Sequence, residues 1–130
     1  MKEYLRVILF VLFSASAAVI EMGMNHFNEI YRLTNTVKPD IGIITNVGTA
    51  HIENLGSREG ILKAKYEITE GMKKGSPLII NGDNDMLATI NTDDFEIIKF
   101  GIEQNDLYMK AENIEFLPDG SQFTAVCENE

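Results

Sequence analysis

Cysteine, histidine and tryptophan are scarce in this sequence: its 130 residues include one cysteine, two histidines and no tryptophan. Cys127 can form no disulfide within the chain, and no Cys or His lies at metal-ligand spacing from it. The single cysteine excludes a disulfide scaffold and fits a reducing compartment. We therefore expect a cytoplasmic protein in which Cys127 is a small buried side chain.

Positive charge is also in short supply. Eleven Lys and Arg residues stand against twenty Asp and Glu residues, which gives a formal net charge of −9, and the basic residues are scattered along the chain. Such a chain repels a phosphate backbone, which argues against nucleic acid as a partner. A phosphorylated ligand would need a metal ion to bind here.

Long hydrophobic runs are absent except near the N-terminus. The run Val7 to Phe13 is short for a membrane span, so we expect no membrane partner. Basic residues precede this run and the small residues 14–18 follow it, as in a secretory signal peptide. Two interpretations stay open: a cleaved leader of a secreted acidic domain, or an apolar leader (residues 1–16) ahead of one domain (residues 17–130).

Two common catalytic patterns are missing. No Gly-x-x-x-x-Gly-Lys-Ser/Thr stretch occurs, so no segment offers a phosphate-cradling loop of that type. No nucleophile elbow occurs either, and Cys127 lies on a predicted strand. Neither a Ser-His-Asp nor a Cys-His hydrolase is indicated.

What the sequence does contain is an alternation of short apolar runs with helical periodicity, which predicts an α/β fold with a mostly parallel sheet and helical crossovers. Hydrophobic residues make up 45% of the chain, as in ordinary globular proteins. We expect buried strands at 17–20, 41–45, 78–80 and 96–100, with helices at 26–33, 57–72 and 85–90. The 41–45 strand is predicted to be central and covered on both faces. An antiparallel hairpin, 108–114 with 122–127, is expected at the C-terminus.

Lys65 is the most informative single residue. At about 100° per residue it falls on the apolar face of the 57–72 helix, whereas the other charged residues are expected to point to the opposite side: Glu59, Lys63, Glu67, Glu70 and Lys74. Burying an unpaired ammonium is costly, so the side chain snorkels to solvent, loses its proton, pairs with a carboxylate or is converted chemically. A neutral lysine can react with carbon dioxide to give a carbamate, which is an anion able to bind magnesium.

Glu21 and His51 follow the first two predicted strands. Carboxyl ends of parallel strands meet at one edge of the sheet, where open α/β folds bind their ligands. A carboxylate suits a hard cation, and an imidazole can coordinate a metal through one ring nitrogen. Both residues can equally be ordinary surface side chains. The functional alternative is a metal site at this edge, formed by Glu21, His51 and Lys65.

Several segments resemble the central domain of the Mur ligase family, in matching order and spacing: residues 21–26, 38–46, 48–51, 56–57 and 64–68. Among its members, the similarity is greatest to the one that adds D-alanyl-D-alanine to UDP-N-acetylmuramoyl-tripeptide. The resemblance runs from about Val19 to the C-terminus. It implies a cytoplasmic, ATP-dependent amide ligase of peptidoglycan biosynthesis, with small-molecule substrates and Mg²⁺ stabilising the transferring phosphoryl group.

The resemblance also implies residue roles. Glu21 and His51 would be magnesium ligands, Lys65 the carbamylated lysine that helps hold a second ion, and Asn81 the residue near the adenine. Asn25 and Asn46 would lie in the neighbourhood of the substrate.

Two departures from the family stand out: Asn28 replaces a usual glycine, and the family's phosphate loop does not precede Glu21. We therefore expect a fragment that is inactive alone; the alternative is a non-catalytic binding remnant.

Overall fold

The computed structural model describes residues 17–127, and the apolar leader predicted for residues 1–16 lies outside this range. The helical elements are α1 (Glu29–Val37), α2 (Ile52–Leu55), α3 (Arg58–Tyr66) and two 3₁₀ helices, η1 (Glu67–Gly71) and η2 (Leu87–Thr89). The strands are β1 (Gly42–Ile44), β2 (Pro77–Asn81), β3 (Glu96–Gly101), β4 (Met109–Leu117) and β5 (Gly120–Cys127). No helix in this part of the chain is long and apolar enough to cross a membrane.

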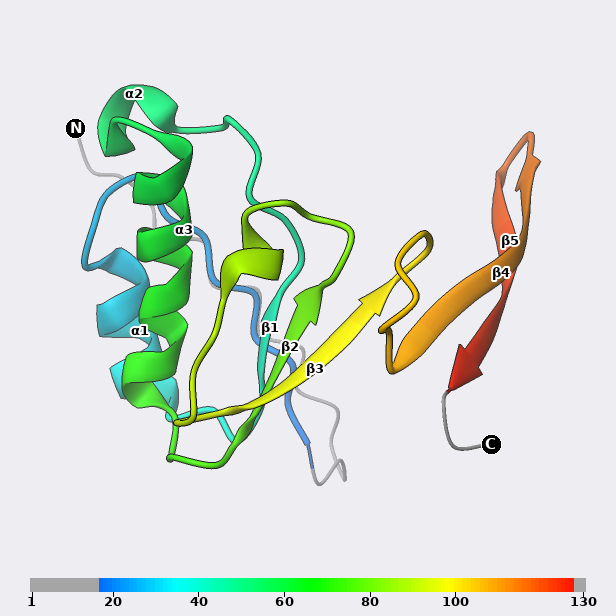
Figure 1. The fold of residues 1–130 in the computed structure, drawn as a ribbon. Helices are drawn as coiled ribbons and strands as arrows, with labels where there is room; N and C mark the ends of the chain where they lie inside the picture. The colour runs from blue at the N-terminus through cyan, green and yellow to red at the C-terminus, as the bar shows by residue number, and fades with distance from the viewer. Residues whose placement is uncertain (1–16, 128–130) are drawn as a thin grey trace.

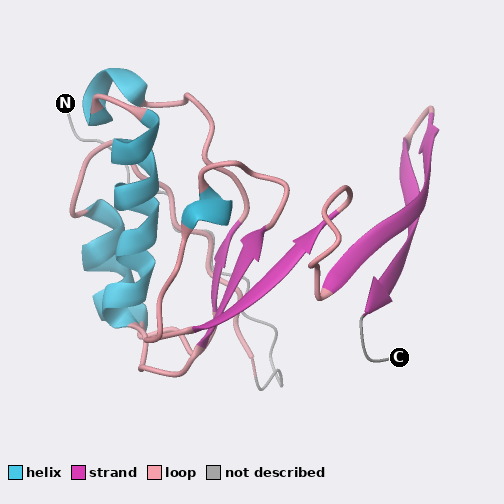
Figure 2. Ribbon diagram, viewed as in Figure 1, coloured by secondary structure: helices cyan, strands magenta, loops and turns pink. Residues whose placement is uncertain are grey.

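The strands form a single mixed sheet in the order β1-β2-β3-β4-β5. The first four strands run parallel, and β5 pairs antiparallel with β4. Figure 1 shows α1 and α3 side by side next to the β1–β3 part of the sheet, with the β4–β5 hairpin extending away from the helices. The same view coloured by secondary structure shows the helical and strand regions separately (Figure 2). The predicted α/β class, mostly parallel sheet and C-terminal hairpin are confirmed.

The core lies between the helices and one face of the sheet. Gly42 and Ile44 of β1 and Leu78 and Ile80 of β2 are buried. The side chains of Ile44, Leu78 and Ile80 belong to one apolar cluster with α3 residues such as Ile61. The opposite face of β1 is open in the described part of the chain, where the Ile43 side chain is 52% exposed. The expectation that this strand is covered on both faces and central is therefore wrong for these residues, because β1 is the edge strand.

The strand expected at 17–20 is also wrong. Only Ile20 makes an isolated bridge, and the preceding Val19 is 79% exposed. A segment with one bridge and exposed side chains has neither the ladder hydrogen bonds nor the burial that would hold a strand in the sheet.

Helix α1 begins three residues later than the predicted helix at residue 26. Asn28 takes a left-handed conformation (φ 67°), which a helical residue cannot adopt, so the helix starts at Glu29. Ile30 and Thr34 are buried, whereas Phe27 and Tyr31 are exposed. The helix ends at Val37, before Pro39, with Lys38 also left-handed.

Helix α3 begins as predicted. The Ser57 side chain accepts a hydrogen bond from the backbone N–H of Gly60 at 3.2 Å, which is an N-cap. The single helix expected as far as Met72 divides after Tyr66, where the backbone tightens into η1. Gly71 at the end of η1 lies directly against the backbone of Thr34 in α1, and the Thr34 hydroxyl donates to the Ile68 carbonyl at 2.6 Å.

The helix predicted for 85–90 shortens to η2, and the hairpin strands extend closer to their turn than expected. The hairpin has an irregularity between Glu112 and Glu115, where Asn113 adopts φ 51°. Cys127, at the end of β5, is half-buried.

Candidate functional site

The carboxyl ends of β1 and β2 lie at the same edge of the sheet, because the two strands are parallel neighbours in register from Gly42↔Leu78 to Ile44↔Ile80. Two loops leave this edge (Figure 1): residues 45–51, which lead to α2, and residues 82–86, which lead to η2. The first carries Asn46 and His51, and the second follows Asn81, the last residue of β2.

His51 is the N-cap residue of α2 and adopts a left-handed conformation (φ 66°). Its imidazole is exposed, makes no capping hydrogen bond and forms no ion pair within residues 17–127. The backbone carbonyl of His51 accepts from Asn54 at 3.1 Å and Leu55 at 3.2 Å, so the first turn of α2 fixes the position of the residue. Both ring nitrogens remain available to a ligand.

Glu21 is exposed and follows the Ile20 bridge. The segment after it is anchored by Glu29, whose Oε2 accepts from the backbone N–H of Asn25 at 2.6 Å and of His26 at 3.2 Å. The hydrogen bond from Asn25 is the main reason why the pKa of the Glu29 carboxyl is below its ordinary value. The His26 ring lies 3.6 Å from the Glu29 carboxylate, so His26 serves this anchor.

Glu67 holds the other end of the same segment. Its two carboxylate oxygens accept from the backbone N–H groups of Asn28 at 2.8 Å and Tyr31 at 3.1 Å, which are free donors at the start of α1. Glu67 is half-buried rather than pointing away from the core. The expectation for this residue is wrong because α3 gives way to a 3₁₀ turn after Tyr66, so the 100° periodicity no longer applies there.

Lys65 lies in the last turn of α3 and is half-buried. Burial lowers the pKa of its ammonium group below the ordinary value. Within the described residues it forms no ion pair and no side-chain hydrogen bond. A lowered pKa raises the fraction of neutral amine at a given pH, which is the form that reacts with carbon dioxide.

No hydrogen bond or ion pair joins Glu21, His51 and Lys65 to one another in the part of the chain that the structure describes, and residues 17–127 hold no group of three or more His, Cys, Asp or Glu side chains at metal-binding distances. The predicted ligands are the Glu21 carboxylate, the His51 imidazole and Lys65. Their convergence on one ion remains a prediction.

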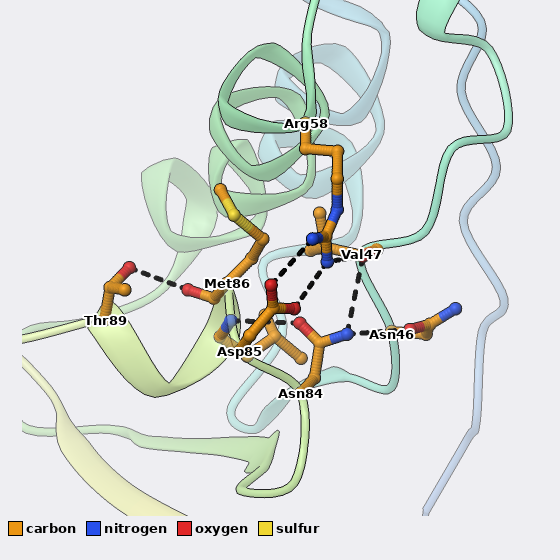
Figure 3. A network of polar contacts seen from close by, with 8 residues as sticks. Asn46, Val47, Arg58, Asn84, Asp85, Met86 and Thr89 are labelled. Atoms are coloured by element: carbon orange, nitrogen blue, oxygen red, sulfur yellow. Dashed lines mark hydrogen bonds and ion pairs between the residues drawn. The ribbon is translucent and has the colours of Figure 1, made fainter.

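A polar network that sequence reasoning missed joins the two loops (Figure 3). The Arg58 guanidinium, in the first turn of α3, donates to both carboxylate oxygens of Asp85, at 2.7 Å and 2.5 Å, and to the Val47 carbonyl at 2.9 Å. These hydrogen bonds hold the pKa of the Asp85 carboxyl below its ordinary value and raise that of Arg58. No periodicity or motif marks this pair, because its members lie 27 residues apart.

Asn84 completes the network. Its amide nitrogen donates to the Asn46 side chain at 2.9 Å, and its amide oxygen accepts from the Leu87 N–H at 3.1 Å. Asn81 organises the turn that leads to it, since the Asn81 side chain accepts from the Asp83 N–H at 3.0 Å. Asn46 and Asn81, which were predicted to lie near the site, therefore both take part in the hydrogen bonds that organise these two loops.

Asp83 closes the next turn through hydrogen bonds to its carboxylate, which link this turn to the acid stability of the fold. It accepts from the backbone N–H groups of Ile102 at 2.5 Å, Glu103 at 3.1 Å and Gln104 at 3.0 Å. Partial burial would raise the pKa of the Asp83 carboxyl, but these hydrogen bonds and the charge of Lys110 outweigh burial, and the pKa lies below its ordinary value.

A carboxyl whose pKa is lowered by folding stabilises the fold above its unfolded pKa, about 3.9 for Asp, and that contribution is lost as the pH falls through the lower, folded value. We therefore expect Asp83→Asn to lower the free energy of unfolding more at pH 7 than at pH 3, measured by urea denaturation. The control is Asp119→Asn in the exposed hairpin turn. An equal effect of Asp83→Asn at both pH values would contradict the assignment.

An open pocket of about 600 Å³ lies beside β3, lined by residues that include Ile97, Lys99 and Tyr108. None of the predicted site residues lines it. The candidate site is therefore the loop edge itself rather than this pocket.

Comparison with known proteins places the chain in a family. Residues 6–130 match the family described as the Mur ligase middle domain. The chain is 38% identical over 110 residues to the UDP-N-acetylmuramoyl-tripeptide–D-alanyl-D-alanine ligase of Haemophilus influenzae, covering 84% of this chain and 23% of the relative. It is 49% identical over 70 residues to the Bacillus subtilis ligase of the same name, covering 54% of this chain and 15% of the relative.

Solved structures agree on the fold. A crystal structure of MurF from Acinetobacter baumannii superposes with a TM-score of 0.65 at 30% identity, covering 82% of this chain and 25% of that one. MurF from Thermotoga maritima in complex with ADP gives 0.66 at 24% identity, covering 78% of this chain and 23% of that one. The chain thus spans less than a quarter of the curated relatives named here. On the extent of the family match and the shared fold, the chain belongs to the Mur ligase family and carries middle-domain sequence.

Proposed function

We propose that this chain is part of an ATP-dependent ligase that joins D-alanyl-D-alanine to UDP-N-acetylmuramoyl-tripeptide in the cytoplasm. The observation that carries the proposal is the 38% identity to a ligase of that name over 84% of the chain. Joining a carboxylate to an amine requires activation of the carboxylate, and phosphorylation by ATP supplies it. The amine of D-alanyl-D-alanine then attacks the acyl phosphate; the bond between the acyl carbon and the phosphate oxygen breaks, inorganic phosphate leaves, and the amine loses a proton to give the amide.

The proposed contribution of this chain is to hold Mg²⁺ and position the nucleotide. Magnesium, when bound, neutralises charge on the phosphoryl group that is transferred. Glu21, His51 and Lys65, the last as its carbamate, would hold it. The Glu21 carboxylate and the oxygens of a Lys65 carbamate suit a hard cation. The His51 imidazole would add one nitrogen ligand, and Glu21 and His51 are both exposed without side-chain partners among residues 17–127.

Three asparagine residues are proposed to position the nucleotide and the substrate. Asn81, at the end of β2, is the residue proposed to lie near the adenine. Asn25 and Asn46 are proposed to lie close to the substrate. Asn25 is held through its backbone by Glu29, and Asn46 through its side chain by Asn84, so both are oriented by neighbours before any ligand binds.

The proposal is tested by titrating the isotope-labelled chain with Mg²⁺ in bicarbonate buffer and following amide resonances by NMR. We expect resonances of Glu21, His51 and Lys65 to shift together with a common dissociation constant. Lys65→Arg should abolish the common response because an arginine cannot form the carbamate. Lys63→Arg, two residues earlier on the exposed side of α3, is the matched control and should behave as wild type.

Independent responses of the three residues, or a Lys65→Arg variant that titrates as wild type, would contradict the proposed metal site. The isolated chain is also expected to hydrolyse no ATP and to bind it weakly, since the sequence has no Gly-x-x-x-x-Gly-Lys-Ser/Thr loop. Calorimetry that gives micromolar affinity for ATP would contradict that expectation.

A further inference from the structure

We infer that Arg58 is a positioning residue, which holds the His51 loop (residues 45–51) and the Asn84 loop (residues 82–86) together as one unit at the carboxyl edge of the sheet. The importance of this unit for ligand binding rests on the proposed function, but the inference concerns loop order and can be tested without a ligand.

The geometry of Arg58 supports this role. The guanidinium reaches three acceptors on two different loops: both Asp85 oxygens and the Val47 carbonyl. Figure 3 shows the fork directed at Asp85 with the Val47 backbone beside it. A planar guanidinium has five N–H donors in a fixed arrangement, so it can satisfy a bidentate carboxylate and a carbonyl at once. A lysine, with a compact ammonium, cannot reproduce the fork.

The Val47 carbonyl is a suitable anchor for the first loop. The Val47 side chain is fully buried in the core, so its backbone is fixed, and four residues later the loop reaches His51. Asn84 adds two contacts from the other loop, to the Asn46 side chain at 2.9 Å and to the same Val47 carbonyl at 3.4 Å. Each of the two loops therefore takes part in more than one hydrogen bond of this network.

The energetic effect on the whole fold should nevertheless be small. The Arg58 side chain is 34% exposed and that of Asp85 is 68% exposed, and exposed ion pairs contribute little to global stability. A contact that adds little stability yet joins two loops at three points acts mainly on their orientation. Loss of a positioning residue therefore lowers loop order without lowering global stability, whereas loss of a merely structural residue lowers both.

The test compares Arg58→Lys with wild type in the full 130-residue chain, using ¹⁵N relaxation to measure order parameters of the backbone amides at residues 48–51, beyond the buried Val47. We expect values near 0.85 in wild type, typical of rigid backbone, and below about 0.6 in the variant. The free energy of unfolding from urea denaturation should stay close to that of wild type. Arg32→Lys on the exposed side of α1 is the matched control and should change neither quantity.

Two results would overturn the inference: wild-type order parameters in Arg58→Lys, or a loss of order spread equally over the loop and the β2 core strand with a fall in global stability. A parallel Mg²⁺ titration separates the inference from the proposed function. If wild type binds Mg²⁺, Arg58→Lys should weaken binding by roughly 10-fold or more, as for residues that orient metal ligands. If wild type shows no Mg²⁺ response, the metal site fails, while the relaxation data still decide the role of Arg58.

Discussion

Replacing Leu78 by alanine is expected to lower the free energy of unfolding by about 2–5 kcal/mol. Leu78 is fully buried in β2, between β1 and β3 in the sheet, and belongs to the apolar cluster that α3 covers. The substitution removes apolar contacts and leaves a cavity that the surrounding strands and helix cannot fill completely. Urea denaturation at neutral pH, analysed as a two-state transition, measures the change.

Ile43→Ala is the matched control on the other face of the sheet. Ile43 is in the adjacent strand β1 but is 52% exposed, so its truncation leaves no cavity. We expect its effect to stay below about 1 kcal/mol, since little apolar surface is lost from the core. Equal effects of the two substitutions would mean that both faces of the sheet are equally buried, and this result would contradict the structure.

The second large effect is expected from Gly71→Ala. A Cβ atom at this position would overlap with the Thr34 carbonyl and hydroxyl, so α1 and η1 would have to separate. Thr34 is fully buried and donates to the Ile68 carbonyl across the same contact, so separation also weakens a buried hydrogen bond. Overpacking of this kind costs about 1–3 kcal/mol, and a clash with backbone should lie at the upper end.

Gly23→Ala is the control for this substitution. An added Cβ at Gly23 meets no atom within 4 Å, and the change should be neutral or slightly stabilising, because alanine restricts the unfolded chain. Thermal denaturation followed by circular dichroism can rank the two variants. A Gly71→Ala protein as stable as Gly23→Ala would show that the contact between α1 and η1 is looser than described.

The sequence was sufficient to predict the elements whose cause is local. Apolar runs such as Leu78–Ile80 lie in parallel strands, and α3 begins where the helix was predicted, with the Ser57 hydroxyl as its cap. The strand expected before Glu21 failed because an apolar run does not ensure a partner strand, and only Ile20 makes a bridge. The central position expected for β1 failed with it, since β1 is the edge strand of the described sheet.

The candidate site could be predicted only in part. Residue type and position at strand ends indicated Glu21 and His51, and helical periodicity singled out Lys65, which is half-buried with a lowered pKa. The residues that orient the loops could not be found in this way. Arg58 meets Asp85 across 27 positions and Glu67 meets Asn28 across 39, and such pairs become visible only when the chain is folded.

The most direct measurement is a crystal structure of the chain grown with Mg²⁺ and bicarbonate. We predict a carbamate on Lys65 and a shared divalent ion that contacts the Glu21 carboxylate and the His51 ring. A free Lys65 ammonium directed into solvent, with Glu21 and His51 on separate parts of the surface, would contradict it.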